Sequence, residues 1–459
     1  MRQLLFVIGA LLALPVFSQN IAGDWNGITD INGTKLRLVF HIKKENNVYN
    51  ATMDSPDQGA KGIPVSNIEF DNERLLIEIK NIDFKYTGVL KEDSVIEGSF
   101  TQMNTTFPLN LKRGEVKINR PQEPSPPYPY ISEEVKFENK EAGIKLAGTL
   151  TYPKDGVKHP AVVLITGSGS QNRDEELMNH KPFWILADYL TRSGIAVLRF
   201  DDRGFAQSEG NFAEATTEDF ASDAYSAVLY LKTRKEIDPK NIGLIGHSEG
   251  GMIAFMLGAK HKDIAYLISM AGSAIKGDSL MIRQARKLVL TSGVSEEIAE
   301  QNAQTIKRIQ EEINKHSRDF IKMNLDSLIG IVLPQEDSWS NSDMMKRNIA
   351  NSFYQWTSPW GYYFMNYDPM CDIRKISCPV FAINGEKDVQ VEADIHMPNI
   401  EKGLKEAGNK RYTLKVYPDL NHLFQHCETG AMSEYATIEE TMSEEVPEDI
   451  AKWIKEIIR

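Results

Sequence analysis

The chain has 459 residues, of which 41% are hydrophobic and 25% are charged, as in an ordinary globular protein. This length suggests two or three domains, each able to bury a full hydrophobic core without disulfides or metals. The formal net charge of −12 argues against nucleic acid or an anionic membrane surface as a partner.

The first 18 residues predict a secretory signal peptide. Arg2 supplies the positive charge, residues 4–14 form an apolar run, and small residues near Ser18 suit cleavage there. The run is short for a membrane span, although a retained N-terminal anchor is the alternative. We therefore expect an exported protein, periplasmic or secreted, without stable membrane insertion.

Residues 19–114 predict a small all-β barrel or sandwich. Apolar and polar residues alternate with a period of two over residues 36–42, 75–79, 82–86 and 107–111, and Asn, Asp and Gly occupy the gaps. No catalytic constellation is visible in this segment. Substrate docking, dimerisation, shielding of an active site and simple stabilisation all stay open as its role.

Residues 115–131 predict an extended, semi-rigid linker, because this stretch is dense in proline. The remainder, residues 132–459, alternates strand and helix patterns, which predicts an α/β fold with a mostly parallel sheet. More than a hundred residues separate the strand predicted over 265–270 from the one that begins at Pro379. Such a length is too great for a loop, and its helix-like pattern predicts an inserted helical cap over about residues 274–367.

The strand predicted over residues 161–165 ends in a loop rich in glycine and serine, residues 166–174 (TGSGSQNRD). A loop of this kind can present backbone N–H groups to a developing oxyanion. We assign this role to the N–H of Ser168, with Gly169 as the alternative and a turn without function as the simpler interpretation. The loop lacks the third glycine and the acidic partner of a dinucleotide-binding fingerprint.

A charged group, Asp201, Asp202 and Arg203, follows the strand predicted over residues 195–200. We interpret it as a structural corner of ion pairs and hydrogen bonds beside the site, and interpret residues 173–175 (RDE) in the same way. Binding of a substrate phosphate or carboxylate is the alternative.

The most informative motif is residues 246–250 (GHSEG), which lies between an apolar strand pattern and a helical pattern. Strand, sharp turn and helix form the context of a nucleophile elbow, in which a strained serine stands at a helix N-terminus. Ser248 is the predicted nucleophile, and the N–H of Glu249 is the predicted second oxyanion donor. His247 is expected to be structural.

A serine nucleophile needs a base and a carboxylate that orients the base. Asp388 follows the strand predicted over residues 379–384, and His422 follows the strand predicted over residues 412–417. Both therefore stand at strand ends, in the chain order Ser, Asp, His. Less favoured candidates are His426 as the base and, as the carboxylate, Glu386 or Asp419.

From about Val135 to its end, the chain resembles α/β-hydrolases of the esterase and serine-aminopeptidase-like group. The resemblance is carried by residues 167–175 (GSGSQNRDE), 200–204 (FDDRG), 246–250 (GHSEG), 384–388 (NGEKD) and 421–422 (NH). Relatives usually begin the oxyanion loop with His-Gly, where this chain has Thr166-Gly167; the donor is a backbone N–H, so the function does not depend on this change. The resemblance implies the fold and a Ser-His-Asp triad, and indicates little about the substrate.

We therefore expect a secreted serine hydrolase, a carboxylesterase that cleaves small acyl esters with Ser248 as nucleophile, His422 as base and Asp388 as orienting acid. A serine peptidase of the aminopeptidase type, or a thioesterase, could use the same triad. A peptidase would need an acidic site for a substrate ammonium, for which the chain offers Glu296, Glu297 and Glu300. A non-enzymatic binding protein is less favoured.

Three cysteines leave at least one thiol free. Cys371 and Cys378 could pair across a short loop, but the sequence does not imply a disulfide. No CxxC motif or clustered His/Cys spacing predicts a zinc site. Neither a metal nor a cofactor is expected, the expected ligand is a small-molecule ester, and a homo-oligomer is compatible with the sequence.

Overall fold

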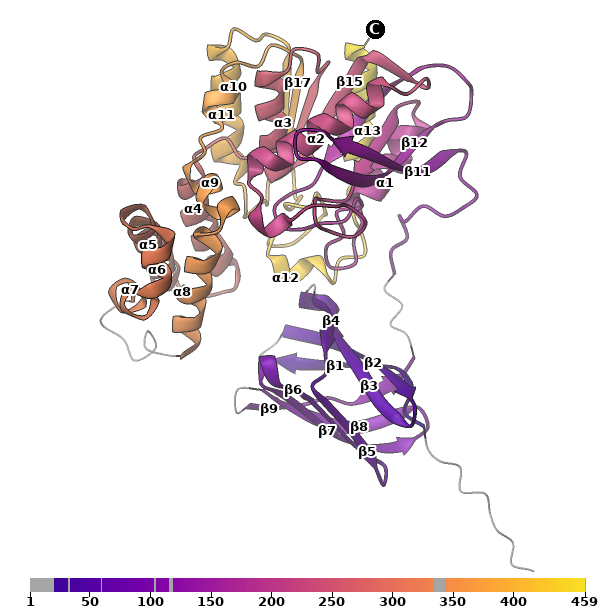
Figure 1. Ribbon diagram of the computed structural model, residues 1–459, viewed down its shortest axis with the longest axis vertical. Helices are drawn as coiled ribbons and strands as arrows, with labels where there is room; N and C mark the ends of the chain where they lie inside the picture. Colours follow the sequence, from indigo (N-terminus) through magenta and orange to yellow (C-terminus); the bar gives the residue numbers. More distant parts are fainter. Residues whose placement is uncertain are drawn as a thin grey trace, which may run out of the picture. The chain divides into compact units, whose positions relative to one another are not determined.

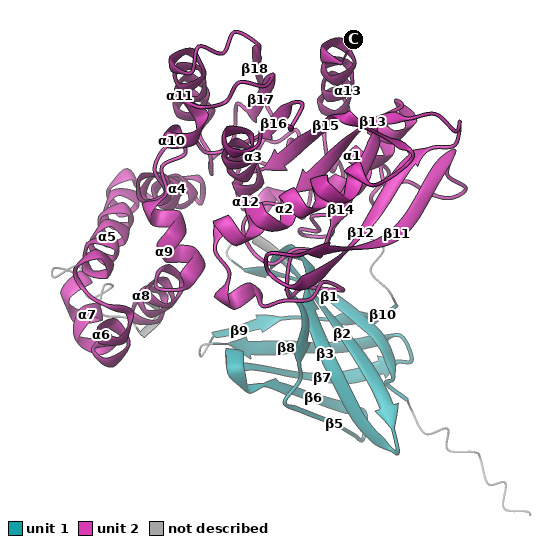
Figure 2. Cartoon of the chain, turned by 45° about the horizontal axis from the view of Figure 1, so that its top comes forward, with its two compact units in different colours: residues 1–118 teal, residues 119–459 magenta. Residues whose placement is uncertain are grey.

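The computed structural model describes residues 20–31, 34–58, 60–102, 105–114, 119–333 and 343–458 (Figure 1). The chain divides into two compact units, residues 1–118 and 119–459 (Figure 2). The predicted signal peptide, residues 1–18, lies outside the described residues. None of the described helices is both long enough and apolar enough to cross a membrane.

The first unit is an antiparallel β half-barrel with the strand order β4-β3-β2-β1-β10-β8-β7-β6-β5, and β9 pairs with β8. Its side chains alternate between core and solvent: in β7, Phe84 and Tyr86 are buried whereas Lys85 and Thr87 are exposed. Trp25 is completely buried, and its indole N–H donates to the carbonyl of Ile21 at 2.8 Å. The strands are β1 Gly23–Ile31, β2 Thr34–Glu45, β3 Val48–Ser55, β4 Ala60–Pro64, β5 Asn67–Asp71, β6 Arg74–Ile79, β7 Phe84–Glu92, β8 Val95–Gln102, β9 Thr105–Pro108 and β10 Leu111–Arg113, with short 3-10 turns at Pro56–Gln58 and Lys80–Ile82.

The second unit contains an eight-stranded sheet in the order β11-β12-β14-β13-β15-β16-β17-β18. The hairpin β11–β12 is antiparallel and joins β14 antiparallel, whereas every pair from β14 to β18 is parallel. The predicted fold class is therefore confirmed. The strands are β11 Tyr130–Asn139, β12 Ile144–Pro153, β13 His159–Ile165, β14 Ala196–Phe200, β15 Ile237–His247, β16 Leu267–Met270, β17 Val380–Gly385 and β18 Tyr412–Tyr417.

Helices cover both faces of this sheet, which explains why its central strands are continuous apolar runs rather than alternating patterns. On β13, Val163 belongs to the core under one set of helices and Val162 to the core under the other. The first face carries α2 Thr217–Lys232, α3 Glu249–Lys260, α10 Met370–Ile373 and α11 Ala393–Glu406. The second face carries α1 Pro182–Arg192 and α13 Glu445–Ile457. A 3-10 turn, Phe212–Glu214, precedes α2, and the short helix α12, Met432–Tyr435, precedes α13.

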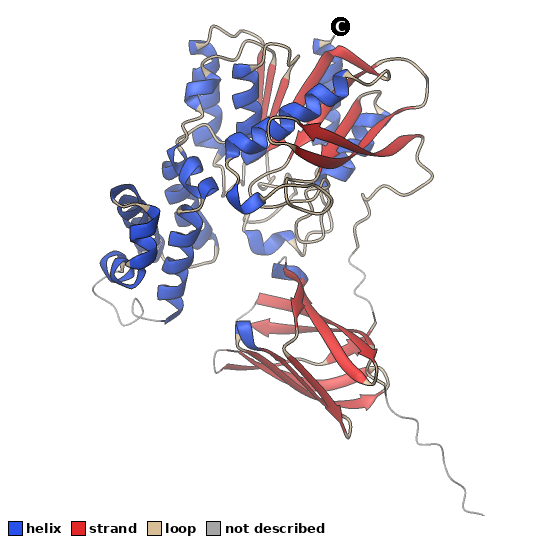
Figure 3. Ribbon diagram, viewed as in Figure 1, coloured by secondary structure: helices blue, strands red, loops and turns tan. Residues whose placement is uncertain are grey.

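Between β16 and β17 the chain forms a helical insertion, which we call the cap. It has its own core, which includes Leu280, Ile309, Phe353 and Trp356, and which also takes in Met252 of α3. Its described residues contain helices and loops but no strand (Figure 3). The cap helices are α4 Gly277–Thr291, α5 Glu296–Lys315, α6 Arg318–Met323, α7 Leu325–Val332, α8 Asp343–Trp356 and α9 Pro359–Asn366.

The proline-dense segment that begins at Asn119 belongs to the second unit. The Arg120 guanidinium donates to the carbonyls of Ile438 at 2.8 Å and Asn179 at 3.1 Å, and the Gln122 amide donates to the carbonyl of Met442 at 2.6 Å. The part of the predicted linker from residue 119 onward is thus bonded to the α/β unit, while residues 115–118 lie outside the described residues.

Candidate active site

Ser248 occupies the turn between β15, which ends at His247, and α3, which begins at Glu249. Its backbone has φ 54° and ψ −116°, in the region that side-chain-bearing residues rarely adopt. Its N–H donates to the carbonyl of Met270 at 2.8 Å, which fastens the turn to the neighbouring strand β16. A strained residue held in this way is typical of functional sites.

The two glycines of the motif are required by close backbone approach. A Cβ on Gly246 would lie 1.9 Å from the carbonyl oxygen of Gly250. A Cβ on Gly250 would lie 2.1 Å from the carbonyl oxygen of Ile165, at the end of β13. The turn can therefore form only because the start of α3 packs directly against two segments of backbone.

Gly250→Ala is expected to destabilise the chain by about 3 kcal/mol, because backbone cannot yield to the added methyl group as a flexible side chain could. Urea unfolding monitored by circular dichroism measures the change. Gly330→Ala is the control, since nothing lies within 4 Å of a Cβ at this exposed position in α7. The control should stabilise the chain by about 0.5–1 kcal/mol; equal stability of the two variants would contradict the packing argument.

Asp388 and His422 are joined by a buried hydrogen bond. Asp388 lies in the loop after β17 and His422 in the loop after β18, each with 4% of its surface exposed. The distance from His422 Nδ1 to Asp388 Oδ2 is 2.7 Å, and Asp388 Oδ1 accepts the backbone N–H groups of Gln390 at 2.8 Å and Val391 at 2.9 Å. The carboxylate accepts on both oxygens, so Nδ1 of His422 carries a proton, and the lone pair of the neutral ring is then on Nε2.

The loop after β18 that carries His422, which we call the base loop, lies against the turn that carries Ser248. The rings of His247 and His422 have their centroids 4.7 Å apart, and His247 Nε2 donates to the carbonyl of His422 at 2.9 Å. Among the described residues, no hydrogen bond joins the Ser248 hydroxyl to His422. Contacts of this kind commonly tighten only when a substrate binds.

The glycine-rich loop after β13 lies beside Ser248, since a Cβ on Gly167 would be 3.2 Å from Ser248 Cβ. The N–H of Gly167 donates to Glu175 Oε1 at 2.8 Å and is therefore occupied. The N–H groups of Ser168 and Glu249 have no hydrogen-bond partner within the part of the chain that the structure describes. These two groups are thus free to donate to a ligand atom.

The less favoured candidates are engaged elsewhere. His426 is exposed and its Nδ1 lies 2.9 Å from Glu440 Oε2. Asp419 pairs with Lys387 at 2.7 Å, and the exposed Glu386 accepts the N–H of Asp419 at 3.3 Å.

Comparison with known proteins agrees with the fold. Residues 160–428, more than half of the chain, match the sequence profile described as alpha/beta hydrolase fold. The chain belongs to this family.

Curated relatives of the hydrolase include the esterase EstD of Thermotoga maritima, 25% identical over 329 residues, which cover 71% of this chain and 69% of EstD. The thiohydrolase aneE of Aspergillus aculeatus is 33% identical over 138 residues, which cover 30% of this chain and 40% of its own length. Among solved structures, the Pyrococcus furiosus esterase Pf2001 aligns with a TM-score of 0.44 at 17% identity, covering 76% of this chain and 100% of that one.

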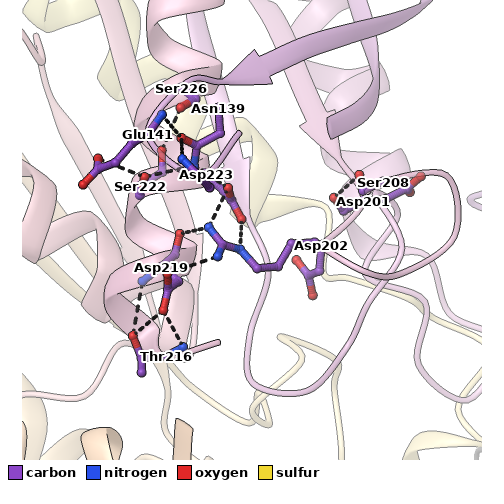
Figure 4. A network of polar contacts seen from close by, with 12 residues as sticks. Asn139, Glu141, Asp201, Asp202, Ser208, Thr216, Asp219, Ser222, Asp223 and Ser226 are labelled. Carbon is purple, nitrogen blue, oxygen red and sulfur yellow. Dashed lines mark hydrogen bonds and ion pairs between the residues drawn. The ribbon is translucent and has the colours of Figure 1, made fainter. Parts of the chain in front are cut away.

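The charged residues after β14 form a corner of ion pairs in the hydrolase. Arg173 contacts Asp201 through Nε at 3.0 Å and Nη2 at 2.7 Å. Arg203 contacts Asp223 through Nε at 2.6 Å and Nη2 at 2.9 Å. It also forms an ion pair with Asp219, and both carboxylates project from α2 (Figure 4). These cations are occupied by protein carboxylates, as expected of a structural corner.

Asp202, in the same corner, has a different environment. It accepts hydrogen bonds from the Thr166 hydroxyl and from the Gln171 N–H, both at 2.8 Å. Burial raises the pKa of Asp202 to about 8, against the opposing effect of these hydrogen bonds. The folded hydrolase therefore holds a proton on Asp202 that the unfolded chain releases above its ordinary pKa of about 4.

Because the folded pKa is the higher one, the free energy of unfolding contributed by Asp202 falls as the pH rises from about 4 to about 8. Asp202→Asn resembles the protonated form and should not show this loss. The variant should gain stability relative to the wild type across this range, by roughly 1 kcal/mol for each pH unit between the two pKa values. Urea unfolding of both proteins at pH 5 and pH 8.5 measures the difference; a difference independent of pH would contradict the buried neutral carboxyl.

The Glu249 side chain has a role that the motif did not reveal. It is buried, and its Oε1 accepts a hydrogen bond from the Thr217 hydroxyl at 2.7 Å. The indole N–H of Trp360 donates to both carboxyl oxygens, at 2.9 Å to Oε1 and 3.0 Å to Oε2. Burial raises its pKa to about 7. Since Trp360 belongs to α9 of the cap, the residue after Ser248 is bonded directly to the cap of the hydrolase.

The remaining predicted residues are also placed. Glu296 pairs with Arg286 of α4, and Glu300 lies 3.5 Å from the same guanidinium, so both are engaged within the cap, whereas Glu297 is exposed. Cys371, Cys378 and Cys427 are free thiols. No group of three or more metal-ligating side chains is present in the described ranges.

Proposed function

We propose that this hydrolase is a carboxylesterase that cleaves small acyl esters through Ser248, His422 and Asp388. The observation that carries the proposal is the buried bond from His422 Nδ1 to Asp388 Oδ2, at 2.7 Å, on a loop packed against the elbow of Ser248. The similarity to the esterase EstD supports the ester class. Export remains a prediction from the sequence.

In the proposed acylation step, Ser248 Oγ attacks the ester carbonyl while His422 Nε2 takes the hydroxyl proton. The carbonyl oxygen becomes an oxyanion and accepts the N–H groups of Ser168 and Glu249. When the tetrahedral intermediate collapses, the C–O bond to the alcohol breaks and His422 returns the proton to the alcohol oxygen. Asp388 holds the ring and stabilises the imidazolium.

In the proposed deacylation step, His422 takes a proton from a water molecule, which attacks the acyl-Ser248 carbonyl. The second tetrahedral intermediate uses the same two N–H donors. Its collapse releases a carboxylic acid and returns the proton to Ser248 Oγ. Every proton transfer in this sequence passes through the single lone pair that Asp388 leaves on His422.

A thioesterase is the second candidate, because the thiohydrolase aneE is 33% identical to part of this chain. The peptidase alternative receives less support, because two of the three cap glutamates that could bind a substrate ammonium contact Arg286.

Fluorophosphonate labelling followed by a paired assay tests the proposal. The wild type should be labelled on Ser248 and should hydrolyse p-nitrophenyl acetate or butyrate faster than the matching thioester or an aminoacyl-p-nitroanilide. Ser292→Ala, an exposed serine at the end of α4, is the labelling control. Preference for the thioester or the anilide would replace the ester assignment, and absence of labelling would overturn the nucleophile.

A further inference from the structure

A buried acid–base pair that the proposed mechanism does not use lies beside the elbow. Glu175 follows the glycine-rich loop, and His247 directly precedes Ser248; they are 3% and 6% exposed. Their bond, from His247 Nδ1 to Glu175 Oε1, is 2.9 Å long. Glu175 has φ 52°, a left-handed conformation that residues with a side chain rarely adopt.

The pair joins three segments that are far apart in the sequence. Glu175 Oε1 also accepts the N–H of Gly167 at 2.8 Å, which ties it to the loop that carries Ser168. His247 Nε2 donates to the carbonyl of His422 at 2.9 Å, which ties it to the base loop. The loop with the oxyanion donor, the elbow and the base loop thus meet at one ion pair.

The partners determine the protonation of His247. A carbonyl oxygen and a carboxylate can only accept, so both ring nitrogens donate and the ring is an imidazolium. Burial by itself lowers the pKa of His247, but the Glu175 carboxylate, together with the His422 carbonyl, raises it above the ordinary value. A neutral ring could satisfy only one of the two acceptors.

The occupied N–H of Gly167 has a direct geometric consequence. Because this amide is bound to Glu175, the Thr166–Gly167 peptide plane is fixed. The next peptide, which carries the N–H of Ser168, is therefore anchored at one end and can turn only about φ and ψ of Gly167. On the other side, fixing the carbonyl of His422 restrains the backbone from which the imidazole projects. A misplacement of about 1 Å in such groups can cost about 100-fold in rate.

We propose that Glu175 and His247 form a positioning clamp that sets the oxyanion donor and the base against Ser248. The inference rests on the proposed function, because the clamp acts on the groups that the proposed reaction uses. Neither residue touches the reacting atoms; both are positioning residues. The clamp holds geometry that matters in the transition state, so its loss lowers kcat and leaves KM nearly unchanged.

Two substitutions in the full chain separate the charge of Glu175 from its role as acceptor for the Gly167 N–H. Glu175→Ala removes both the charge and the acceptor for Gly167, and we expect kcat for p-nitrophenyl acetate to fall by about 100-fold or more, the effect of losing one oxyanion donor. Glu175→Gln keeps an acceptor for the Gly167 N–H but removes the charge that keeps His247 protonated. It should recover part of the lost kcat, with KM within about threefold of the wild type in both variants.

His159→Gln is the matched control. His159 is also a buried histidine beside a carboxylate, 2.8 Å from Asp155 Oδ1, but it lies at the start of β13, the end of the strand opposite the glycine-rich loop. Its loss should lower the melting temperature without lowering kcat. Amide hydrogen exchange supplies a readout independent of activity: Glu175→Ala should speed exchange in residues 166–171 and 421–425, and His159→Gln should not.

A cooperatively melting Glu175→Ala variant with kcat within about threefold of the wild type, or with unchanged exchange in both loops, would overturn the clamp. If Glu175→Ala does not fold, Glu175→Gln carries the same test. If the wild type is neither labelled by fluorophosphonate nor active on esters, the proposed function fails and the catalytic role of the clamp fails with it. Exchange that nevertheless rises in both loops would then show that the pair fastens the loops for another purpose.

Discussion

Ser248→Ala is expected to lower kcat for a p-nitrophenyl ester by about 10⁴- to 10⁶-fold and to abolish fluorophosphonate labelling. In the proposed mechanism the hydroxyl oxygen of Ser248 forms the acyl bond, and the neighbouring His247 cannot replace it, because its ring is bonded to Glu175 and to the carbonyl of His422. The remaining rate would come from the N–H donors and from binding alone. Stopped-flow or end-point release of p-nitrophenol measures the change.

The control for this variant is its stability. Alanine at φ 54° is as strained as serine, so Ser248→Ala should unfold at nearly the same denaturant concentration as the wild type. Ser248→Gly should be equally inactive but more stable by about 1 kcal/mol, since glycine adopts this φ without strain. Activity of Ser248→Ala within about tenfold of the wild type would place the nucleophile elsewhere.

Asp388→Asn is expected to lower kcat by about 10⁴-fold through the wrong tautomer of His422. Oδ1 of Asp388 accepts two backbone N–H groups, so an asparagine must leave its oxygen there and turn its amide nitrogen toward His422. The amide donates to Nδ1, which forces the ring proton onto Nε2 and removes the lone pair that serves as base. The pH dependence of kcat/KM and the kcat at its plateau measure the effect.

Glu386→Gln and Asp419→Asn are the matched controls, because both carboxylates lie on the same loops but neither contacts His422. Glu386 accepts the backbone N–H of Asp419, and the Asp419 carboxylate pairs with Lys387. Both variants should keep kcat within about threefold of the wild type. Near-normal turnover of Asp388→Asn, together with a large loss in one of the controls, would transfer the orienting role to that carboxylate.

The placement of Ser248, Asp388 and His422 at strand ends could be predicted because each follows a short apolar run with a clear break. Buried parallel strands are continuous apolar segments, and their carboxyl ends meet at one edge of the sheet. The turn of Ser248 was predictable from Gly246 and Gly250, whose small size is needed where backbone meets backbone. These signals are local in the sequence, so they can be recognised without knowledge of the tertiary structure.

The contacts of Glu175 and Glu249 could not be predicted in the same way. Glu175 meets a histidine 72 residues away and Glu249 meets a tryptophan 111 residues away, and nothing in the spacing marks either pair. A glutamate beside a nucleophile elbow is consistent with solvent exposure until the cap is in place. The pairing of β1 with β10 in the middle of the half-barrel sheet is also long-range, because alternation predicts strands but not their partners.

The bond between Glu249 and Trp360 bears on attempts to change substrate range by exchanging the cap for that of another hydrolase. A foreign cap without an indole N–H at this place would leave the Glu249 carboxyl buried with only the Thr217 hydroxyl. An unsatisfied buried carboxyl costs about 1–3 kcal/mol or more, and here the cost falls on the residue whose N–H is a proposed oxyanion donor. An exchanged cap should be accepted if it keeps Trp360, or if Glu249 is replaced by an apolar residue at the same time. A cap exchange that does neither should lower both stability and turnover.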